Sequence, residues 1–213
     1  MQWHDGAGEE VEYRPGFGRA LAVGVLVVCA LAVGATLLSH PSIAWRYVPP
    51  AALVVVCVWA AYWWPAVLVT PGGVVLRNVT RTIELPWPSI QRIDTKFALT
   101  LFTAYGSYSA WAAPAPGRME VARAGGGVAA GSEGAGLPES AVSAGTIAPG
   151  DLPSSPSGAA AALVRRRWEQ LRDDGALDNP RLERANPVVR WHWRTLLAIA
   201  ALAAASAATL LTG

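Results

Sequence analysis

The chain has 213 residues, of which 53% are hydrophobic and only 15% charged, against about 25% charged in an ordinary soluble domain. The apolar excess is concentrated in a few uncharged runs, which indicates an integral membrane protein. A net charge of +2 gives no support for nucleic-acid binding. Cys29 and Cys57 both fall inside apolar runs, so we expect buried, reduced thiols, with a lipid-embedded disulfide as the alternative.

Residues 1–19 carry several carboxylates, which predicts an N-terminal tail rather than a cleaved signal peptide. Two apolar runs follow, with cores at residues 20–39 and 48–69 and no Asp, Glu, Lys or Arg in either. A bilayer core requires about 20 apolar helical residues, so both runs are long enough to cross it. Because the linker is short, we expect a two-helix transmembrane hairpin over residues 20–69. Aromatic residues flank both ends of the second run, as at membrane interfaces: Trp45, Tyr47, Tyr62, Trp63 and Trp64.

The distribution of cations predicts the topology. Fourteen of the 17 Lys and Arg residues lie between Arg77 and Arg194, whereas the hairpin loop carries only Arg46. The positive-inside rule then places the N-terminus and the middle region in the cytoplasm and the hairpin loop outside. We therefore expect a multi-pass protein of the plasma membrane.

Residues 66–112 change from a helical to an alternating pattern of apolar residues, which predicts a β-rich region. After an extended entry at 67–70 and a Pro-Gly-Gly turn, short strands are predicted at 74–78, 80–85, 90–95, 98–104 and 107–112. A meander of this kind must close or be covered to bury its core.

Residues 113–158 are rich in Gly, Ala, Ser and Pro and predict a disordered insertion. Their Gly-rich stretch has no Gly-Lys-Ser/Thr element and therefore does not match a phosphate loop. Residues 159–177 then predict an amphipathic helix, with Ser157 as its N-cap and Gly175 as its stop.

One face of this predicted helix is apolar. Val164, Trp168 and Leu171 follow one another at i, i+4 and i+7, which places them on the side that faces a core. Arg165 and Arg166 fall at other positions and form a solvated face or a partner contact. A meander followed by one such helix suggests a small barrel with the helix over one end.

Three segments resemble a known group: VTPGGVVLRN (69–78), LPWPSI (85–90) and VRRRWEQLRDDG (164–175). Together with the preceding membrane helices, they resemble the bacterial pleckstrin-homology-like (PH-like) family of membrane proteins named after the low-molecular-weight protein antigen 6 of actinobacteria. The resemblance covers residues 46–112 and 159–178 and implies a PH-like β-barrel capped by a C-terminal helix. The strand region is short for seven strands, so residues 119–123 or 141–147 could supply a missing one.

A third apolar run, residues 191–212, begins with Trp191 and Trp193 and predicts a third transmembrane helix. The alternative is a helix that packs on the protein or lies in the membrane interface.

Catalysis has no support in the sequence. His4, His40 and His192 fall in separate regions, the carboxylates are scattered, and no metal-ligand or cofactor pattern is present. We therefore expect a non-enzyme without a cofactor or bound metal.

Four cations at the start of the β region are candidate contacts for anionic lipid headgroups: Arg77, Arg81, Arg92 and Lys96. The alternative is that they only satisfy the positive-inside rule. Trp87 is expected in the barrel core or at an interface.

The function expected from these features is a membrane-anchored PH-like scaffold that binds a protein partner at the cytoplasmic face. Lipid-headgroup binding and an accessory role in a transport complex are the alternatives. The sequence leaves the oligomeric state and the partner's identity open.

Overall fold

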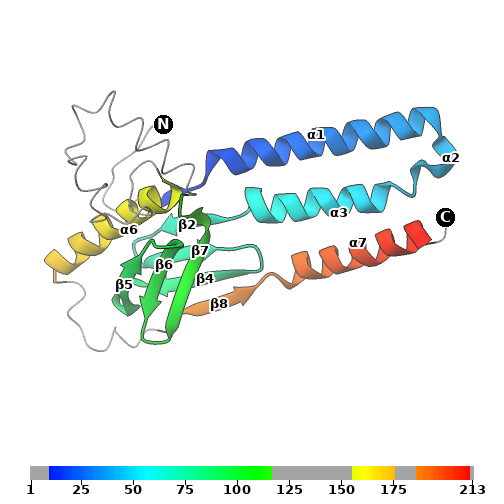
Figure 1. The fold of residues 1–213 in the computed structure, drawn as a ribbon. Coiled ribbons are helices and arrows are strands. Elements are labelled where there is room, and N and C mark those ends of the chain that lie inside the picture. Colours follow the sequence, from blue (N-terminus) through cyan, green and yellow to red (C-terminus); the bar gives the residue numbers. More distant parts are fainter. Residues whose placement is uncertain (1–9, 117–154, 176–185, 212–213) are drawn as a thin grey trace, which may run out of the picture. The chain divides into compact units, whose positions relative to one another are not determined.

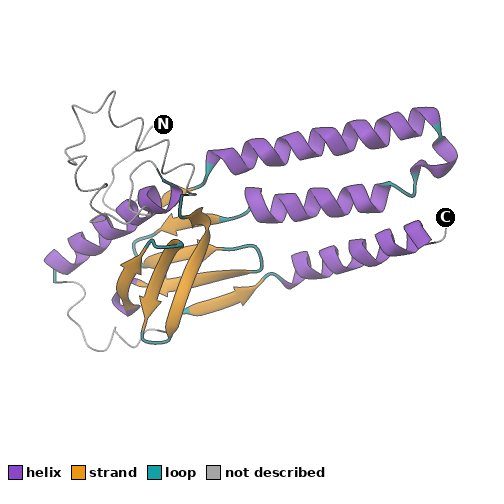
Figure 2. Ribbon diagram, viewed as in Figure 1, coloured by secondary structure: helices purple, strands orange, loops and turns teal. Residues whose placement is uncertain are grey.

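The computed structural model describes residues 10–116, 155–175 and 186–211. The chain divides into two compact units. The β unit comprises Met1–Arg14, Ala66–Arg77 and Ile83–Val189, and the helical unit comprises Pro15–Pro65, Asn78–Thr82 and Arg190–Gly213. Figure 1 traces the chain through both units, and Figure 2 distinguishes their strands from their helices.

The strands form two hydrogen-bonded sheets. The first sheet has the spatial order β1 (Val11–Tyr13), β2 (Ala66–Val69), β3 (Gly73–Arg77), β4 (Arg81–Pro86), β8 (Val188–Trp191). The second has the order β5 (Ile90–Asp94), β6 (Ala98–Thr103), β7 (Gly106–Pro114), and the short 3-10 helix η2 (Trp87–Ser89) links β4 to β5. Within the described residues the sheets do not join into a single closed barrel.

The core of the β unit follows from the alternation of apolar residues. Along β6, Leu99 and Leu101 are fully buried, while Thr100 between them is only partly buried. Leu76, Ile83 and Leu85 of β3 and β4 join the same apolar cluster. Helix α6 (Pro156–Asp173) packs against strands of both sheets and contributes to this cluster. The predicted arrangement, a β region followed by a helix and flanked by apolar helices, is therefore confirmed.

The N-cap of helix α6 lies two residues earlier than expected. The N-cap is Ser155, whose Oγ accepts a hydrogen bond from the Gly158 N–H at 3.0 Å, so the predicted cap at Ser157 is wrong. Pro156 explains the position, because its fixed φ and missing N–H suit the first residue of a helix. The helix ends at Asp173, and Gly175 adopts φ +68° just beyond it, the left-handed conformation typical of a helix stop.

The helical unit contains α1 (Gly16–Ser39), the short α2 (Pro41–Ala44), α3 (Val48–Val58), the π-helical turn η1 (Trp59–Trp63) and α7 (Trp193–Leu211). Helix α1 packs against α3 and η1, and α7 packs against α3. Two helices among the described residues are long and apolar enough to cross a membrane, Gly18–Ser39 and Trp193–Leu211. The intervening helical stretch, Val48–Trp63, is apolar but shorter.

The second apolar run does not remain helical to residue 69. Its helix ends at Trp63, and Ala66–Val69 form the fully buried strand β2. Pro65 separates the two, because a proline cannot donate the hydrogen bond that would continue the helix. Strand β2 is apolar throughout because it pairs with β1 on one side and β3 on the other, and such a strand looks like the end of a membrane helix in the sequence.

Two strands were not expected. Strand β1 comes from the predicted N-terminal tail and pairs antiparallel with β2, with Glu12 opposite Leu68. Strand β8 precedes α7 and lies at the other edge of the same sheet, so Trp191 belongs to a strand and α7 starts at Trp193. Residues 119–123 and 141–147, proposed as a missing strand, and most of the predicted 113–158 insertion lie outside the described residues.

Gly73, at the start of β3, allows the chain to approach the end of β4 closely. A Cβ at this position would lie 2.1 Å from the carbonyl oxygen of Leu85 and 2.9 Å from the Cα of Pro86. Both are backbone atoms, so relief requires the strands to separate. We expect Gly73→Ala to lower the free energy of unfolding by about 2 kcal/mol or more. Thermal unfolding of the full chain in lipid nanodiscs, followed by near-UV circular dichroism, measures this effect.

Gly72→Ala is the matched control, because a Cβ at Gly72 has no atom within 4 Å. Its unfolding is expected to stay within about 0.5 kcal/mol of the wild type. Equal stability of the two variants would contradict the close approach of β3 and β4.

Candidate functional site

The four cations predicted to contact lipid headgroups lie in different parts of the structure. Arg77 ends β3 and belongs to the β unit, whereas Arg81 begins β4 and belongs to the helical unit. Arg92 lies in β5, and Lys96 in the turn between β5 and β6. Their neighbours therefore differ, and their role as headgroup contacts stays a prediction.

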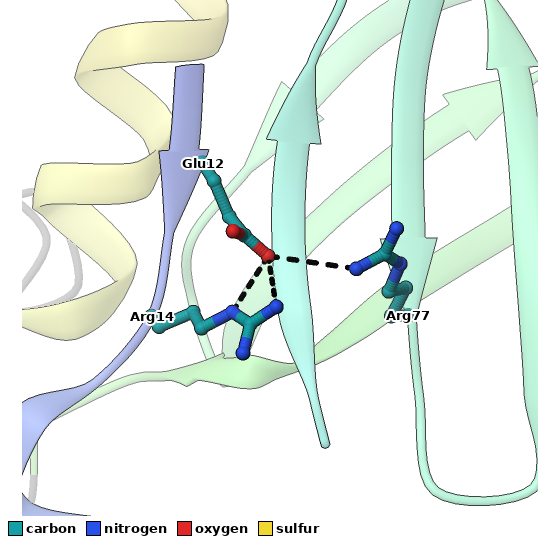
Figure 3. Close-up of polar contacts among 3 residues, drawn as sticks. All are labelled: Glu12, Arg14 and Arg77. Carbon is teal, nitrogen blue, oxygen red and sulfur yellow. Dashed lines mark hydrogen bonds and ion pairs between the residues drawn. The ribbon is translucent and has the colours of Figure 1, made fainter. Parts of the chain in front are cut away.

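Arg77 lies beside a carboxylate from the unexpected strand β1. Glu12 Oε1 is 3.6 Å from a terminal guanidinium nitrogen of Arg77 and accepts a hydrogen bond from Arg14 Nε at 2.6 Å (Figure 3). The side chains of Glu12 and Arg77 are 38% and 33% exposed, and ion pairs this exposed contribute about 0–1 kcal/mol. Glu12 thus lowers the positive potential at Arg77 without removing the guanidinium from solvent.

At one end of the helical unit, cations lie against tryptophans in two places. The first is Arg19 with Trp63, and the second is Arg81 with Trp191, which neighbours Trp193. The guanidinium of Arg19 lies 5.4 Å from the Trp63 ring, and that of Arg81 5.5 Å from the Trp191 ring. Trp191 and Trp193 are ring neighbours at 6.1 Å. Tryptophan and arginine together are typical of the level of lipid headgroups, where a ring has both apolar and polar surroundings.

His192 organises the same end of the helical unit. Its Nε2 is 2.9 Å from Thr82 Oγ1 and its Nδ1 3.3 Å from the carbonyl oxygen of Val79, while its ring stands edge-on to Trp64 at 5.9 Å. The carbonyl of Val79 can only accept, so Nδ1 carries the proton in that bond and the Thr82 hydroxyl donates to Nε2 when the ring is neutral. Sequence reasoning missed this role, because the only local signal is a histidine between two tryptophans.

The two remaining predicted cations lie against phenylalanine rings of the second sheet. The Arg92 guanidinium is 4.1 Å from the Phe102 ring centroid, and Lys96 Nζ is 5.3 Å from that of Phe97. Phe97 is 80% exposed at the turn between β5 and β6. The side chains of Arg92 and Lys96 are themselves exposed, so this edge presents cations and an apolar ring to its surroundings.

Helix α6 presents two different faces. Val164 is fully buried, and Trp168 and Leu171 pack against the core while remaining partly exposed. Arg166 is exposed and Arg165 partly buried. The helix therefore covers the sheets with one side and offers cations on the other.

Trp87 lies in the core rather than at an interface. It is 2% exposed, and its indole N–H donates a hydrogen bond of 2.9 Å to the carbonyl oxygen of Thr70. Burial of a tryptophan in this way is stabilising because its one polar group is satisfied.

A bound metal ion has no geometric support in the described residues. No group of three or more His, Cys, Asp or Glu side chains there could hold a metal ion. Cys29 and Cys57 are both free thiols, and each is partly exposed in an apolar helix.

Comparison with known proteins identifies the β region. Residues 64–151 match the family model described as "Bacterial PH domain". The match includes β2 to β7 and ends before α6. No curated protein and no solved structure matches the chain. The antigen-6 type and an actinobacterial origin stay predictions. Residues 64–151 of this chain are therefore similar to a bacterial PH domain, which confirms the predicted PH-like β region.

Proposed function

We propose that this protein is a non-catalytic, membrane-anchored interaction module, whose PH domain binds a partner protein at the cytoplasmic face of the plasma membrane. The observation that carries the proposal is the joining of a bacterial PH domain to long apolar helices whose side chains the protein itself leaves exposed. None of the apolar 18-residue window of α1 is buried, and only 6% of that of α7.

Lipid is the environment that suits these helices. Leu31, Leu38 and Leu197 are 68%, 89% and 67% exposed, and each fully buried leucine contributes about 1.5–3 kcal/mol relative to water. At 1.5 Å per residue, the 24 residues of α1 extend about 36 Å and the 19 of α7 about 28 Å, close to the roughly 30 Å of a bilayer core. The shorter α3–η1 stretch crosses if the bilayer thins locally or the flanking aromatics anchor it.

The cations of the helical unit support a cytoplasmic PH domain. Gly18 lies against Tyr62, and the His192 ring stands edge-on to Trp64, so the start of α1, the end of η1 and the start of α7 lie at the same end. This end carries Arg19, Arg81, Arg190 and Arg194. The opposite end carries Arg46 between α2 and α3. By the positive-inside rule, the arginine-rich end and the PH domain joined to it are cytoplasmic.

Cysteine labelling tests this topology. In a chain with Cys29→Ala and Cys57→Ala, Ser42→Cys in the hairpin loop and Ser107→Cys in β7 each provide one exposed thiol. A membrane-impermeant maleimide is expected to label position 42 in intact cells and position 107 only after lysis. The reverse pattern would overturn the orientation, and labelling of both positions in intact cells would contradict membrane crossing.

The outer face of α6 is the proposed partner surface. The buried half of the helix is fixed to the core through Ala160, Ala161 and Val164, so the exposed half is held rigidly. Arg165 and Arg166 leave this face with cations that suit an acidic segment of a partner. The half-buried Trp168 and Leu171 border them and supply apolar contact.

Site-specific photo-crosslinking tests the partner surface. A photoreactive residue at the exposed Glu169 of the full chain in native membranes is expected to give one discrete protein adduct. Arg165→Ala with Arg166→Ala should reduce the adduct about fivefold or more, because each lost charge contact costs about 1 kcal/mol. Lys96→Ala, which removes an exposed cation from the turn between β5 and β6, is the control and should retain the adduct. An adduct that survives the double substitution would contradict the assignment.

Binding of anionic lipid headgroups is the second candidate, and the partly exposed guanidinium of Arg77 favours it. Arg77 ends β3, and a cation near an anionic leaflet contributes about 1 kcal/mol. Glu12 opposes this attraction because its carboxylate lies 3.6 Å from Arg77.

Substitution of Glu12 tests this second candidate. Glu12→Gln should increase the selectivity of the reconstituted chain for spin-labelled phosphatidylglycerol over phosphatidylcholine, and Arg77→Ala should reduce it by up to about fivefold. Both effects should fade at high salt, since about 1 M ionic strength screens exposed charges beyond roughly 3 Å. Asp173→Asn, which neutralises a carboxylate paired with Arg172 on α6, is the control. If the lipid selectivity is the same in both variants and at high salt, the result would count against headgroup binding.

A further inference from the structure

The helical unit contains an apolar groove between its first two helices. A cavity of about 320 Å³ lies between α1 and the α3–η1 stretch. Ala22, Val23 and Leu26 of α1 form one wall, and the other includes Val56, Trp59 and Trp63. The volume is within the range of small-molecule sites, roughly 300–1,000 Å³.

Local backbone geometry creates this groove. Gly18 brings α1 against η1, because a Cβ there would lie 2.9 Å from the Tyr62 carbonyl oxygen. The helices therefore touch at this end, and the groove begins one turn further along α1, beside the small side chain of Ala22. The π-helical turn, with its hydrogen bond from Trp64 N–H to the Trp59 carbonyl at 3.1 Å, places two tryptophan rings in the wall. Single π-turns of this kind occur frequently at functional sites.

A cation stands at the mouth of the groove. The ring of Trp63 lines the groove and also lies 5.4 Å from the Arg19 guanidinium, so one side chain connects the apolar space to the charge. Arg19 precedes Ala22 by three residues, close to one helical turn, and its side chain is exposed. An apolar cavity with a cation at one end complements an acyl chain that ends in an anionic group.

We propose that this groove binds one acyl chain of an anionic phospholipid, with the lipid phosphate at Arg19. The inference rests on the membrane insertion of the proposed function, which the cysteine labelling tests separately. Arg19 at the cytoplasmic end of the groove selects a lipid of the inner leaflet. The ring faces of Trp59 and Trp63 contact the acyl chain, and Trp63 also orients the guanidinium of Arg19.

Native mass spectrometry of the full chain, released from nanodiscs with equal phosphatidylglycerol and phosphatidylcholine of matched chains, tests the proposal. The wild type should retain phosphatidylglycerol at least fivefold over phosphatidylcholine. Arg19→Gln should bring the two lipids within about twofold of each other. Arg194→Gln, which removes an exposed arginine from the start of α7, is the matched charge control and should leave the preference unchanged.

A second test of the proposal fills the groove with a larger side chain from either wall. Ala22→Leu and Val56→Phe should each lower the bound lipid at least threefold, whereas Ala30→Leu, at an exposed position of α1 outside the groove, should not. Circular dichroism checks that the helices persist. If both filled variants unfold, the lipid preference of Arg19→Gln compared with that of Arg194→Gln decides whether the proposal holds.

Three results would overturn the proposal. Equal retention of both lipids by the wild type would mean ordinary boundary lipid only. If both filled variants retain as much bound lipid as the wild type, the lipid binds outside the groove. A doubled mass that Ala22→Leu abolishes would show that a second copy of the chain occupies the groove instead. Each result can occur while cysteine labelling still shows a membrane-inserted chain with a cytoplasmic PH domain.

Discussion

Three strands of the five-stranded sheet, β1, β2 and β8, are each joined to an apolar helical segment by a very short connection, and the local structure around these joins depends on this constraint. Two residues separate β1 from α1, two separate η1 from β2, and His192 alone separates β8 from α7. The two edge strands and one inner strand of the same sheet are therefore each continuous with an apolar helix.

This constraint explains three local features of the structure, in β1, at Gly18 and at His192. Strand β1 has only three residues and could not be stable by itself, but its pairing with β2 places Glu12 near Arg77. Gly18 is required where α1 approaches η1, and the apolar groove begins next to this contact. His192 satisfies both of its ring nitrogens with residues 79 and 82, and in this way fixes the single-residue join before α7. Loss of any of these contacts would act first on the joins between strands and helices.

The proposed functions use different surfaces, and they are compatible with one another. A partner would bind the cationic side of α6, whose opposite side is fixed by Ala160, Ala161 and Val164. A lipid would bind in the helical unit, where arginines and tryptophans lie together. A chain organised in this way has separate surfaces for a partner protein and for a lipid. Arg92, Lys96 and the exposed Phe97 provide a further surface that neither proposal requires.

The sequence by itself determined the class of the protein: uncharged apolar runs, an alternating region that matches a PH-like fold, and a following helix whose i, i+4, i+7 residues face a core. These features depend on periodicity and composition, which are local properties. Only the tertiary structure decided where the second helix ends, because a strand buried by neighbours on both sides has the same apolar composition as a membrane helix. It alone revealed β1 and β8, whose partners are distant in sequence, and it separated Arg77, Arg81, Arg92 and Lys96, which are close in sequence but lie on different elements. The apolar groove likewise has no signal in the sequence, since its walls come from two helices and its shape from one glycine and one π-turn.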